Sequence, residues 1–445
     1  MDDATLPRIN PVCDCGGRSL PLRSRRAPRR RATGATRAQR CQGNSQARST
    51  VMSDVSRDTM LLTTPFHSRV EAMCDLNDWG NWMGYTTPNA YFDVELEYFA
   101  VRSTTGVFDL SPMNKYRVTG PDAQRYLDRL ITRDVSKIGV DRVGYAIWCD
   151  DNGQVMDDGT IFRLGEQDYR ICSYQRADDW LAWNTLGFDV TIENESEAVA
   201  GLAVQGPTSC TVLTLLGCTD LNQLKPFGIA HYSFEGRPLM VSRTGFTGDL
   251  GYEVWVPPES AEALWDQLFE LGRDYLIKPI GSHALELARI EAGFLQANVD
   301  FMPAEEVVRV GRTRSPFELG LGWLVDFKKP LFNGRSALLK EQEKGSRYRF
   351  AMLDVEGNKP AEHSFILKGD KQVGTVTSAA WCPTAKANIA YAQIEMPHGA
   401  VGDELVAEIY YQRELHWTRL LAPCKVIDAP IFKSPKRWQT PAPPH

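Results

Sequence analysis

The order of apolar and polar positions predicts an irregular mixture of strands and helices. Residues 116–119 alternate as in a strand, and Gly120-Pro121-Asp122 then ends the strand and begins a helix over 123–130. Proline suits a first helical turn and aspartate can cap it. The expected order from there is the helix, a central hairpin, a strand, a helix and a strand. That order favours an α+β fold over a doubly wound sheet.

The same strand, Gly-Pro, helix arrangement returns later in the chain. An apolar strand over 198–205 ends at Gly206-Pro207 and precedes a helix over 208–216. This repetition predicts two similarly built domains. Periodicity also predicts other elements. These are strands at 168–173 and 188–192 and helices at 93–101, 177–186, 260–271 and 281–297. From residue 349 short strands and turns indicate a small all-β C-terminal domain.

Residues 145–162 have the pattern of a hairpin with a turn at 150–153. Two adjacent carboxylates, Asp157 and Asp158, enter its second strand. Because a strand alternates its faces, one should point inward and the other toward solvent or a turn. An inward carboxylate must be paired, hydrogen-bonded or shifted in pKa, which makes this stretch a candidate for chemistry. The alternative is a hairpin with an aspartate-rich turn.

A second informative stretch, 240–256, holds a glycine-rich loop between two strands and places Glu253 within the second strand. A buried Glu253 could accept two parallel N–H groups from the edge of a pterin or purine. The alternative is a glutamate on an edge strand facing solvent. Within the expected helix 281–297, Glu286 and Arg289 are three residues apart and should pair on one face.

Charge is divided unevenly along the chain. Residues 1–50 contain eleven Arg, three Asp and no Lys or Glu, so their net charge is +8. Because the whole chain has a net charge of −6, the remaining residues carry −14. The acidic body makes nucleic acid an unsuitable partner. We expect 1–51 to be a disordered basic leader. It is either an organelle targeting segment or an upstream extension, with synthesis beginning at Met52 or Met60.

The remaining composition predicts a soluble cytoplasmic protein without a metal site. No apolar run reaches the roughly 20 residues that a membrane span needs. The ten cysteines and seven histidines show no ligand spacing, which favours reduced thiols.

Taken together, several short motifs resemble the glycine cleavage T-protein (aminomethyltransferase) family. They follow the family's order over roughly 60–430. They are Gly106-Val107-Phe108-Asp109-Leu110-Ser111, Gly120-Pro121-Asp122-Ala123, Asp157-Asp158, Gln205-Gly206-Pro207, Ser242-Arg243-Thr244-Gly245-Phe246-Thr247-Gly248, Tyr252-Glu253, Arg289-Ile290-Glu291-Ala292, Pro316-Phe317-Glu318-Leu319-Gly320-Leu321 and Gly374-Thr375-Val376-Thr377-Ser378.

The resemblance implies a three-domain cloverleaf of α+β class. A folate-binding region over 60–335, made of two interleaved domains, would precede a C-terminal β-barrel over 336–430 and a tail over 431–445. It implies a tetrahydrofolate-dependent one-carbon transferase, acting on an aminomethyl or methyl group. Asp158 matches the catalytic carboxylate. The expected folate-binding residues are Tyr145, Phe246, Glu253, Arg289 and Trp323.

Three positions depart from what the family usually carries: Pro112 replaces a histidine, Leu285 an arginine and Ala297 a tyrosine. The donor is therefore left open between an aminomethyl group on a lipoyl carrier protein and a small methylated amine or sulfonium compound. The second donor would make the protein a folate-dependent demethylase, such as that of dimethylsulfoniopropionate. A non-catalytic folate-binding protein is a further alternative, weakened because 302–315 contain no cysteine.

Overall fold

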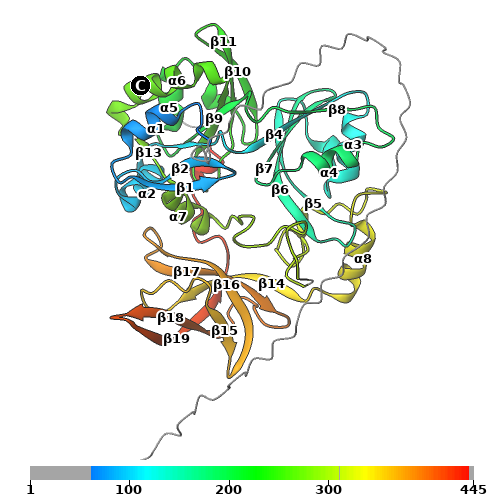
Figure 1. Cartoon of the computed structure of the whole chain (residues 1–445), viewed down its shortest axis with the longest axis vertical. Coiled ribbons are helices and arrows are strands. Elements are labelled where there is room, and N and C mark those ends of the chain that lie inside the picture. Colours follow the sequence, from blue (N-terminus) through cyan, green and yellow to red (C-terminus); the bar gives the residue numbers. More distant parts are fainter. Residues whose placement is uncertain (1–61, 310, 440–445) are drawn as a thin grey trace, which may run out of the picture. The chain divides into compact units, whose positions relative to one another are not determined.

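The computed structural model describes residues 62–309 and 311–439 (Figure 1). The basic leader predicted over 1–51, the two candidate start residues Met52 and Met60, and the last six residues of the predicted tail lie outside this range. Within it, helices and strands mix as an α+β fold.

The first sheet is antiparallel and carries the predicted hairpin. Its strand order is β5-β6-β7-β4-β8. Helices α3 and α4 cover one face, where Tyr126, Leu127 and Leu181 pack on Val118 and Ile161. The elements are β4 (Asn114–Thr119), α3 (Ala123–Leu130), β5 (Arg142–Cys149), β6 (Val155–Gly165), β7 (Asp168–Ser173), α4 (Asp178–Trp183) and β8 (Thr191–Asn194).

The second sheet has the order β10-β11-β12-β9-β3-β13, in which only the β3–β13 pair is parallel. Its apolar residues pack with α5 and α6 on one side and with α2 and α7 on the other. The elements are α2 (Val94–Ser103), β3 (Gly106–Asp109), β9 (Ala200–Gln205), α5 (Ser209–Leu215), β10 (Ile229–Phe234), β11 (Arg237–Ser242), β12 (Gly251–Val256), α6 (Ala261–Leu271), β13 (Lys278–Pro279) and α7 (Ser282–Ala292).

The repeated Gly-Pro motif does have the same conformation in both halves. Gly120 has a φ of 123° and Gly206 a φ of 126°, and each precedes a helix. A Cβ at Gly120 would lie 2.5 Å from the Asp189 carbonyl oxygen, and one at Gly206 would lie 2.4 Å from that of Thr104. Glycine is therefore required twice for the same reason, and two similarly built domains stay a prediction.

The C-terminal part is a closed barrel in the order β14-β17-β16-β15-β18-β19, as the sequence predicts. Its interior is apolar, with Leu353, Ile366, Ala390 and Ile394 fully buried. It follows α8 (Arg335–Lys344). The strands are β14 (Tyr348–Val355), β15 (Phe365–Lys368), β16 (Lys371–Cys382), β17 (Ala387–Glu395), β18 (Glu404–Arg413) and β19 (His416–Ile427).

Shorter elements complete the fold. They are α1 (His67–Met73), β1 (Asp78–Trp82), β2 (Tyr85–Ala90), η1 (Val135–Lys137), η2 (Leu221–Gln223), η3 (Pro258–Ser260), η4 (Arg273–Tyr275), η5 (Gly322–Leu324) and η6 (Pro435–Arg437). No helix among the described residues is long and apolar enough to cross a bilayer.

Three boundaries differ from the sequence-based expectation. The helix expected over 281–297 ends at Ala292, because Gly293 adopts a left-handed φ of 78° that terminates it. The strand expected over 188–192 is instead β8 at Thr191–Asn194, paired with β4. The helix expected over 177–186 is the shorter α4, which ends at Trp183. Tertiary pairing and capping decide such ends.

Candidate functional site

The two adjacent aspartates of β6 are in different environments. Asp157 is 1% exposed, and its carboxylate accepts the backbone N–H groups of Gln175 and Asp158 at 2.8 and 2.9 Å. Asp158 is partly exposed and lies opposite Ile147 in the hairpin. The alternation expected from the sequence is present. The more accessible carboxylate, Asp158, is therefore the better placed for chemistry.

Tyr145 on β5 holds this carboxylate. Its hydroxyl donates to Oδ2 of Asp158 at 2.6 Å. Burial raises the pKa of Asp158 to about 6, an effect that the Tyr145 hydrogen bond opposes and the charge of Asp300 strengthens. Burial and the Asp158 charge raise the pKa of Tyr145 well above its usual value, so its hydroxyl stays protonated. Asp158 can therefore hold or release a proton close to neutral pH.

Trp323 lies beside this pair. It belongs to η5, its side chain is 69% exposed, and its ring centroid is 6.1 Å from that of Tyr145 at a tilt of 39°. An exposed indole against a half-buried phenol gives the Asp158 region an apolar wall. Asp158, Tyr145 and Trp323 thus form one contiguous group.

Glu253 lies on β12, a strand paired on both sides, with β11 and β9. The alternative of an edge-strand glutamate is therefore wrong, and Glu253 is half-buried. Its Oε2 accepts the Thr244 hydroxyl at 2.6 Å and the Ser242 hydroxyl at 3.4 Å. Burial raises the pKa of Glu253 to about 6, and the two hydroxyls oppose the shift. No basic side chain in the described part of the chain forms an ion pair with it.

The loop between β11 and β12, residues 243–250, is built around Gln205. The Gln205 amide donates to the carbonyl oxygens of Thr244 and Tyr252 at 3.2 and 3.1 Å and accepts the Thr247 hydroxyl at 3.0 Å. A Cβ at Gly245 would lie 2.0 Å from the Gln205 amide oxygen. The glycine lets this side chain fix the loop, which carries Thr244 toward Glu253.

Phe246 of this loop contacts Phe294, a residue that the sequence analysis did not single out. Its ring stacks on Phe294, with centroids 5.2 Å apart and an interplanar angle of 15°. The guanidinium of Arg437 lies 5.0 Å from the Phe294 ring and 4.9 Å from that of Trp438. Burial lowers the pKa of Arg437, and no carboxylate among the described residues forms an ion pair with it. The Pro-rich tail gave no sequence signal for this cation.

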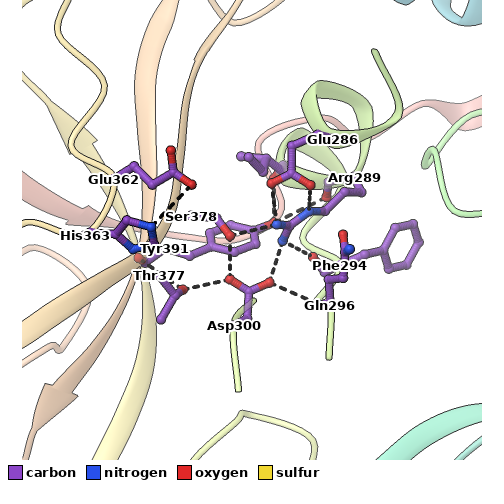
Figure 2. Close-up of polar contacts among 11 residues, drawn as sticks. Glu286, Arg289, Phe294, Gln296, Asp300, Glu362, His363, Thr377, Ser378 and Tyr391 are labelled. Carbon is purple, nitrogen blue, oxygen red and sulfur yellow. Dashed lines mark hydrogen bonds and ion pairs between the residues drawn. The ribbon is translucent and has the colours of Figure 1, made fainter. Parts of the chain in front are cut away.

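Arg289 of α7 is fully buried, and its donors are occupied (Figure 2). It donates to both carboxylate oxygens of Glu286, as predicted, and to Asp300 Oδ2 at 2.5 Å and Ser378 Oγ at 2.7 Å. Asp300 also accepts the Thr377 hydroxyl at 2.7 Å. Asp300 thereby connects α7, β16 and, through its charge, Asp158. Arg289 and Asp300 fasten the barrel to the second sheet's helix.

The predicted site residues therefore fall into separate groups. Asp158, Tyr145 and Trp323 form one group and Glu253, with its loop residue Phe246, the other, whereas Arg289 lies inside the interface with the barrel. Two surface cavities, of about 620 and 330 Å³, are lined by other residues. Neither cavity is lined by Asp158, Tyr145, Glu253 or Arg289. The described residues hold no cluster of three potential metal ligands.

Comparisons with known proteins agree on one family. The GCVT N-terminal domain matches residues 67–329, and the glycine cleavage T-protein C-terminal barrel domain matches residues 349–433. An aminomethyltransferase of Caldanaerobacter subterraneus subsp. tengcongensis is 34% identical over 332 residues, 73% of this chain and 86% of the relative. An aminomethyltransferase of Lysinibacillus sphaericus is 32% identical over 338 residues, which are 75% of this chain and 89% of the relative. This chain belongs to the glycine cleavage T-protein family.

A solved T-protein has the same fold. The aminomethyltransferase T of the glycine cleavage system from Bartonella henselae superposes with a TM-score of 0.74 at 22% identity, covering 86% of this chain and all of that one. The family is one of aminomethyltransferases, so this T-protein family member is a transferase enzyme. The relatives' names do not favour the demethylase alternative.

The three departures from the usual T-protein residues lie in packed regions. Pro112 is buried, Leu285 packs against the core that contains Ala284 and Ala288, and Ala297 is 2% exposed. None supplies a polar side chain to the site.

Proposed function

We propose that this protein transfers an aminomethyl group to tetrahydrofolate. The observation that carries the proposal is Asp158, a partly exposed carboxylate with a pKa of about 6, held in place by the Tyr145 hydroxyl. Such a group can exchange a proton near neutral pH and can stabilise positive charge developing next to it. Both are what the transfer of a one-carbon unit from sulfur to nitrogen requires.

The surroundings of Glu253 fit the pterin ring of a folate. The pterin edge offers parallel N–H donors, which a carboxylate accepts well. Oε2 of Glu253 already accepts from Thr244 and Ser242, and Oε1 makes no hydrogen bond within the described residues. A half-buried acceptor with no basic partner is stabilised by a ligand that brings the missing donors.

The remaining groups suit the rest of the folate. The Phe246–Phe294 stack offers an aromatic surface for the aminobenzoyl ring, and Arg437 is a cation without a carboxylate partner among the described residues. It would attract the glutamate carboxylates. Trp323 and Tyr145 would bound the region near Asp158.

In this proposal Arg289 affects Asp158 through Asp300 and does not contact the ligand. The sequence-based expectation placed it among the folate-binding residues, but its N–H groups already bind Glu286, Asp300, Ser378 and the Phe294 carbonyl oxygen. With no exposed surface it has no donor left for a ligand. We propose that it fixes Asp300, whose charge helps to raise the pKa of Asp158.

The roles then divide between the two carboxylates. Bound tetrahydrofolate supplies the nucleophilic nitrogens that accept the one-carbon unit. Glu253 would orient the pterin, and Asp158 would take up a proton from a folate nitrogen and pass it on. The one-carbon unit would form two bonds to folate nitrogens as its bonds to the carrier sulfur and to the amine break. The two protons that the folate nitrogens lose would leave on the carrier thiol and on ammonia, and the Asp158 carboxylate would stabilise the positive charge on the carbon during the transfer. We propose a lipoyl carrier protein as the partner that presents the aminomethyl group.

A product assay tests the proposal. The full-length protein is incubated with tetrahydrofolate and either an aminomethylated lipoyl carrier or a panel of small methylated amines and sulfonium compounds, and the folate product is weighed by mass spectrometry. Methylene-tetrahydrofolate and ammonia formed only with the carrier are expected. Methyl-tetrahydrofolate from a free small donor would contradict the proposal and identify a demethylase. No folate product with any donor, despite folate binding, would favour the non-catalytic alternative.

We propose a cytoplasmic, reducing location. The cysteines of the described region are all free thiols, and most of them are buried. Cell fractionation with an antibody against the protein would test this, and recovery in an organelle fraction would contradict it.

A further inference from the structure

Residues 431–439, here called the C-terminal brace, lie along the loop 243–250 that carries Thr244. Ser434 Oγ donates to Asp249 Oδ1 at 3.2 Å, at one end of the loop. At the other end, Arg243 donates to the backbone oxygen of Gln439. The brace therefore contacts both ends of the loop, although brace and loop are almost 200 positions apart in sequence.

The middle of the loop is held through Phe432. Its ring lies 3.8 Å from the Arg102 guanidinium carbon, and Arg102 donates to the Thr247 carbonyl oxygen at 2.7 Å. The Phe432 N–H donates to the Glu291 carbonyl oxygen at 3.0 Å. A Cβ at Gly248 would lie 2.5 Å from Ala292 Cβ and 3.5 Å from Phe432. The loop is thus closely packed between α7 and the brace.

Trp438 supports the base of the loop through Phe227. Their ring centroids are 6.4 Å apart. Phe227 has a φ of 61°, which a bulky residue keeps only where its surroundings hold it. Its N–H donates to the Arg243 carbonyl oxygen at 3.0 Å. Trp438 is itself 58% exposed, so its contact with Phe227 contributes little to the core.

We propose that the C-terminal brace is a positioning element for the Glu253 site. By fixing loop 243–250 it keeps the Thr244 hydroxyl 2.6 Å from Glu253, and so keeps the carboxylate aligned for its ligand. Ser434 to Gln439 lie outside the two matched family regions, 67–329 and 349–433. This inference rests on the proposed folate site for its effect on binding.

Two exposed tryptophans give a matched comparison. Trp438→Ala removes the support of Phe227, whereas Trp417→Ala removes a 73% exposed tryptophan from the barrel strand β19. In Trp438→Ala we expect the dissociation constant for tetrahydrofolate and the KM to rise about fivefold to tenfold, with kcat unchanged. Trp417→Ala should match the wild type, and Trp438→Phe should restore most of the affinity. Ser434→Ala, which removes the bond to Asp249, should weaken binding in the same direction.

Hydrogen exchange without ligand separates this inference from the proposed function. Amides 243–250 should exchange faster in Trp438→Ala and in the Ser434→Ala/Trp438→Ala variant, at unchanged melting temperature, and not in Trp417→Ala. Unchanged exchange overturns the inference, even if affinity falls, because Trp438 would then act on the ligand directly or through Arg437, whose guanidinium lies 4.9 Å from its ring. If the wild type binds no folate, the proposed function fails while faster exchange still supports the brace. If the variants show the affinity and the exchange of the wild type, the inference about the brace is wrong and the proposed function is unaffected.

Discussion

The hydroxyl of Tyr145 donates to Oδ2 of Asp158 at 2.6 Å, across the two strands of one hairpin. The two residues are diagonal neighbours, because Tyr145 lies opposite Thr160 and Asp158 opposite Ile147. The hydrogen bond stabilises the charged carboxylate and so opposes the upward pKa shift that burial causes. The pKa of Asp158, about 6, reflects chiefly these two opposing effects, and the charge of Asp300 adds to the rise.

Replacing Tyr145 with Phe should move the pH dependence of transfer. Without the donor, the pKa of Asp158 rises, so the acidic limb of the kcat/KM profile should shift to higher pH by about half to one unit, equivalent to a hydrogen bond of ~1 kcal/mol. The profile is measured from pH 5 to 9. Tyr410→Phe removes an exposed barrel hydroxyl that donates to Glu408 and serves as control. An unmoved acidic limb in Tyr145→Phe would show that Asp158 does not control the rate.

The adjacent aspartates should give opposite phenotypes. Asp158→Asn should lower kcat by about 10²- to 10⁴-fold, the range for a lost acid–base group, with little change in stability. Asp157→Asn should destabilise the fold by about 1–3 kcal/mol, because its amide cannot accept both the Gln175 and Asp158 N–H groups. Steady-state kinetics and urea unfolding distinguish them. A fully active Asp158→Asn enzyme would remove Asp158 from the mechanism.

Glu253→Gln should bind folate more weakly and fold more stably at neutral pH. The loss of charge should weaken tetrahydrofolate binding by about 10- to 100-fold, measured by titration calorimetry. Because burial raises the pKa of Glu253 from 4.5 to about 6, the native state holds the proton over a wider range than the unfolded chain. The Glu253 contribution to the free energy of unfolding is therefore present below pH 4.5 and is lost as the pH rises to 6.

The stability difference between Glu253→Gln and the wild type should consequently grow in favour of the variant across that interval and stay constant above it. Denaturant unfolding at a series of pH values measures it. A difference that is flat between pH 4 and 7 would show that the Glu253 carboxyl is not shifted, and wild-type affinity for folate would show that Glu253 does not hold the pterin.

Arg289→Met should destabilise the protein strongly. The change leaves Asp300 buried without its cation, which typically costs about 3–5 kcal/mol. Arg237→Met, which removes an exposed partner of Glu259, should change the free energy of unfolding by less than about 1 kcal/mol. Chemical unfolding of both variants tests this. Similar small losses would mean that the Arg289–Asp300 pair does not join α7 to the barrel.

The local pattern of residues was sufficient for the elements and for the two carboxylates. Alternation along 145–162 predicts a hairpin with Asp157 and Asp158 on opposite faces. The repeated Gly-Pro predicts two similar units, and the structure gives both glycines a positive φ. These features depend on neighbours within a few residues, which the sequence displays directly.

Other parts of the candidate site gave no such signal. Asp300 follows a glycine-terminated helix, Phe294 lies in irregular chain, and Arg437 is in a Pro-rich tail. Their contacts join positions far apart in sequence, such as Arg437 with Phe294 and Asp300 with Ser378. Periodicity carries no information about such pairs.

The sequence by itself thus determined the α+β class, the barrel, the family and the candidate acids Asp158 and Glu253. Only the tertiary structure decided that Arg289 is a fully occupied structural cation and that residues 431–439 pack along loop 243–250. The physical reason is that strand alternation and turn geometry are local, whereas burial, ion pairing and pKa depend on which distant segments the fold brings into contact.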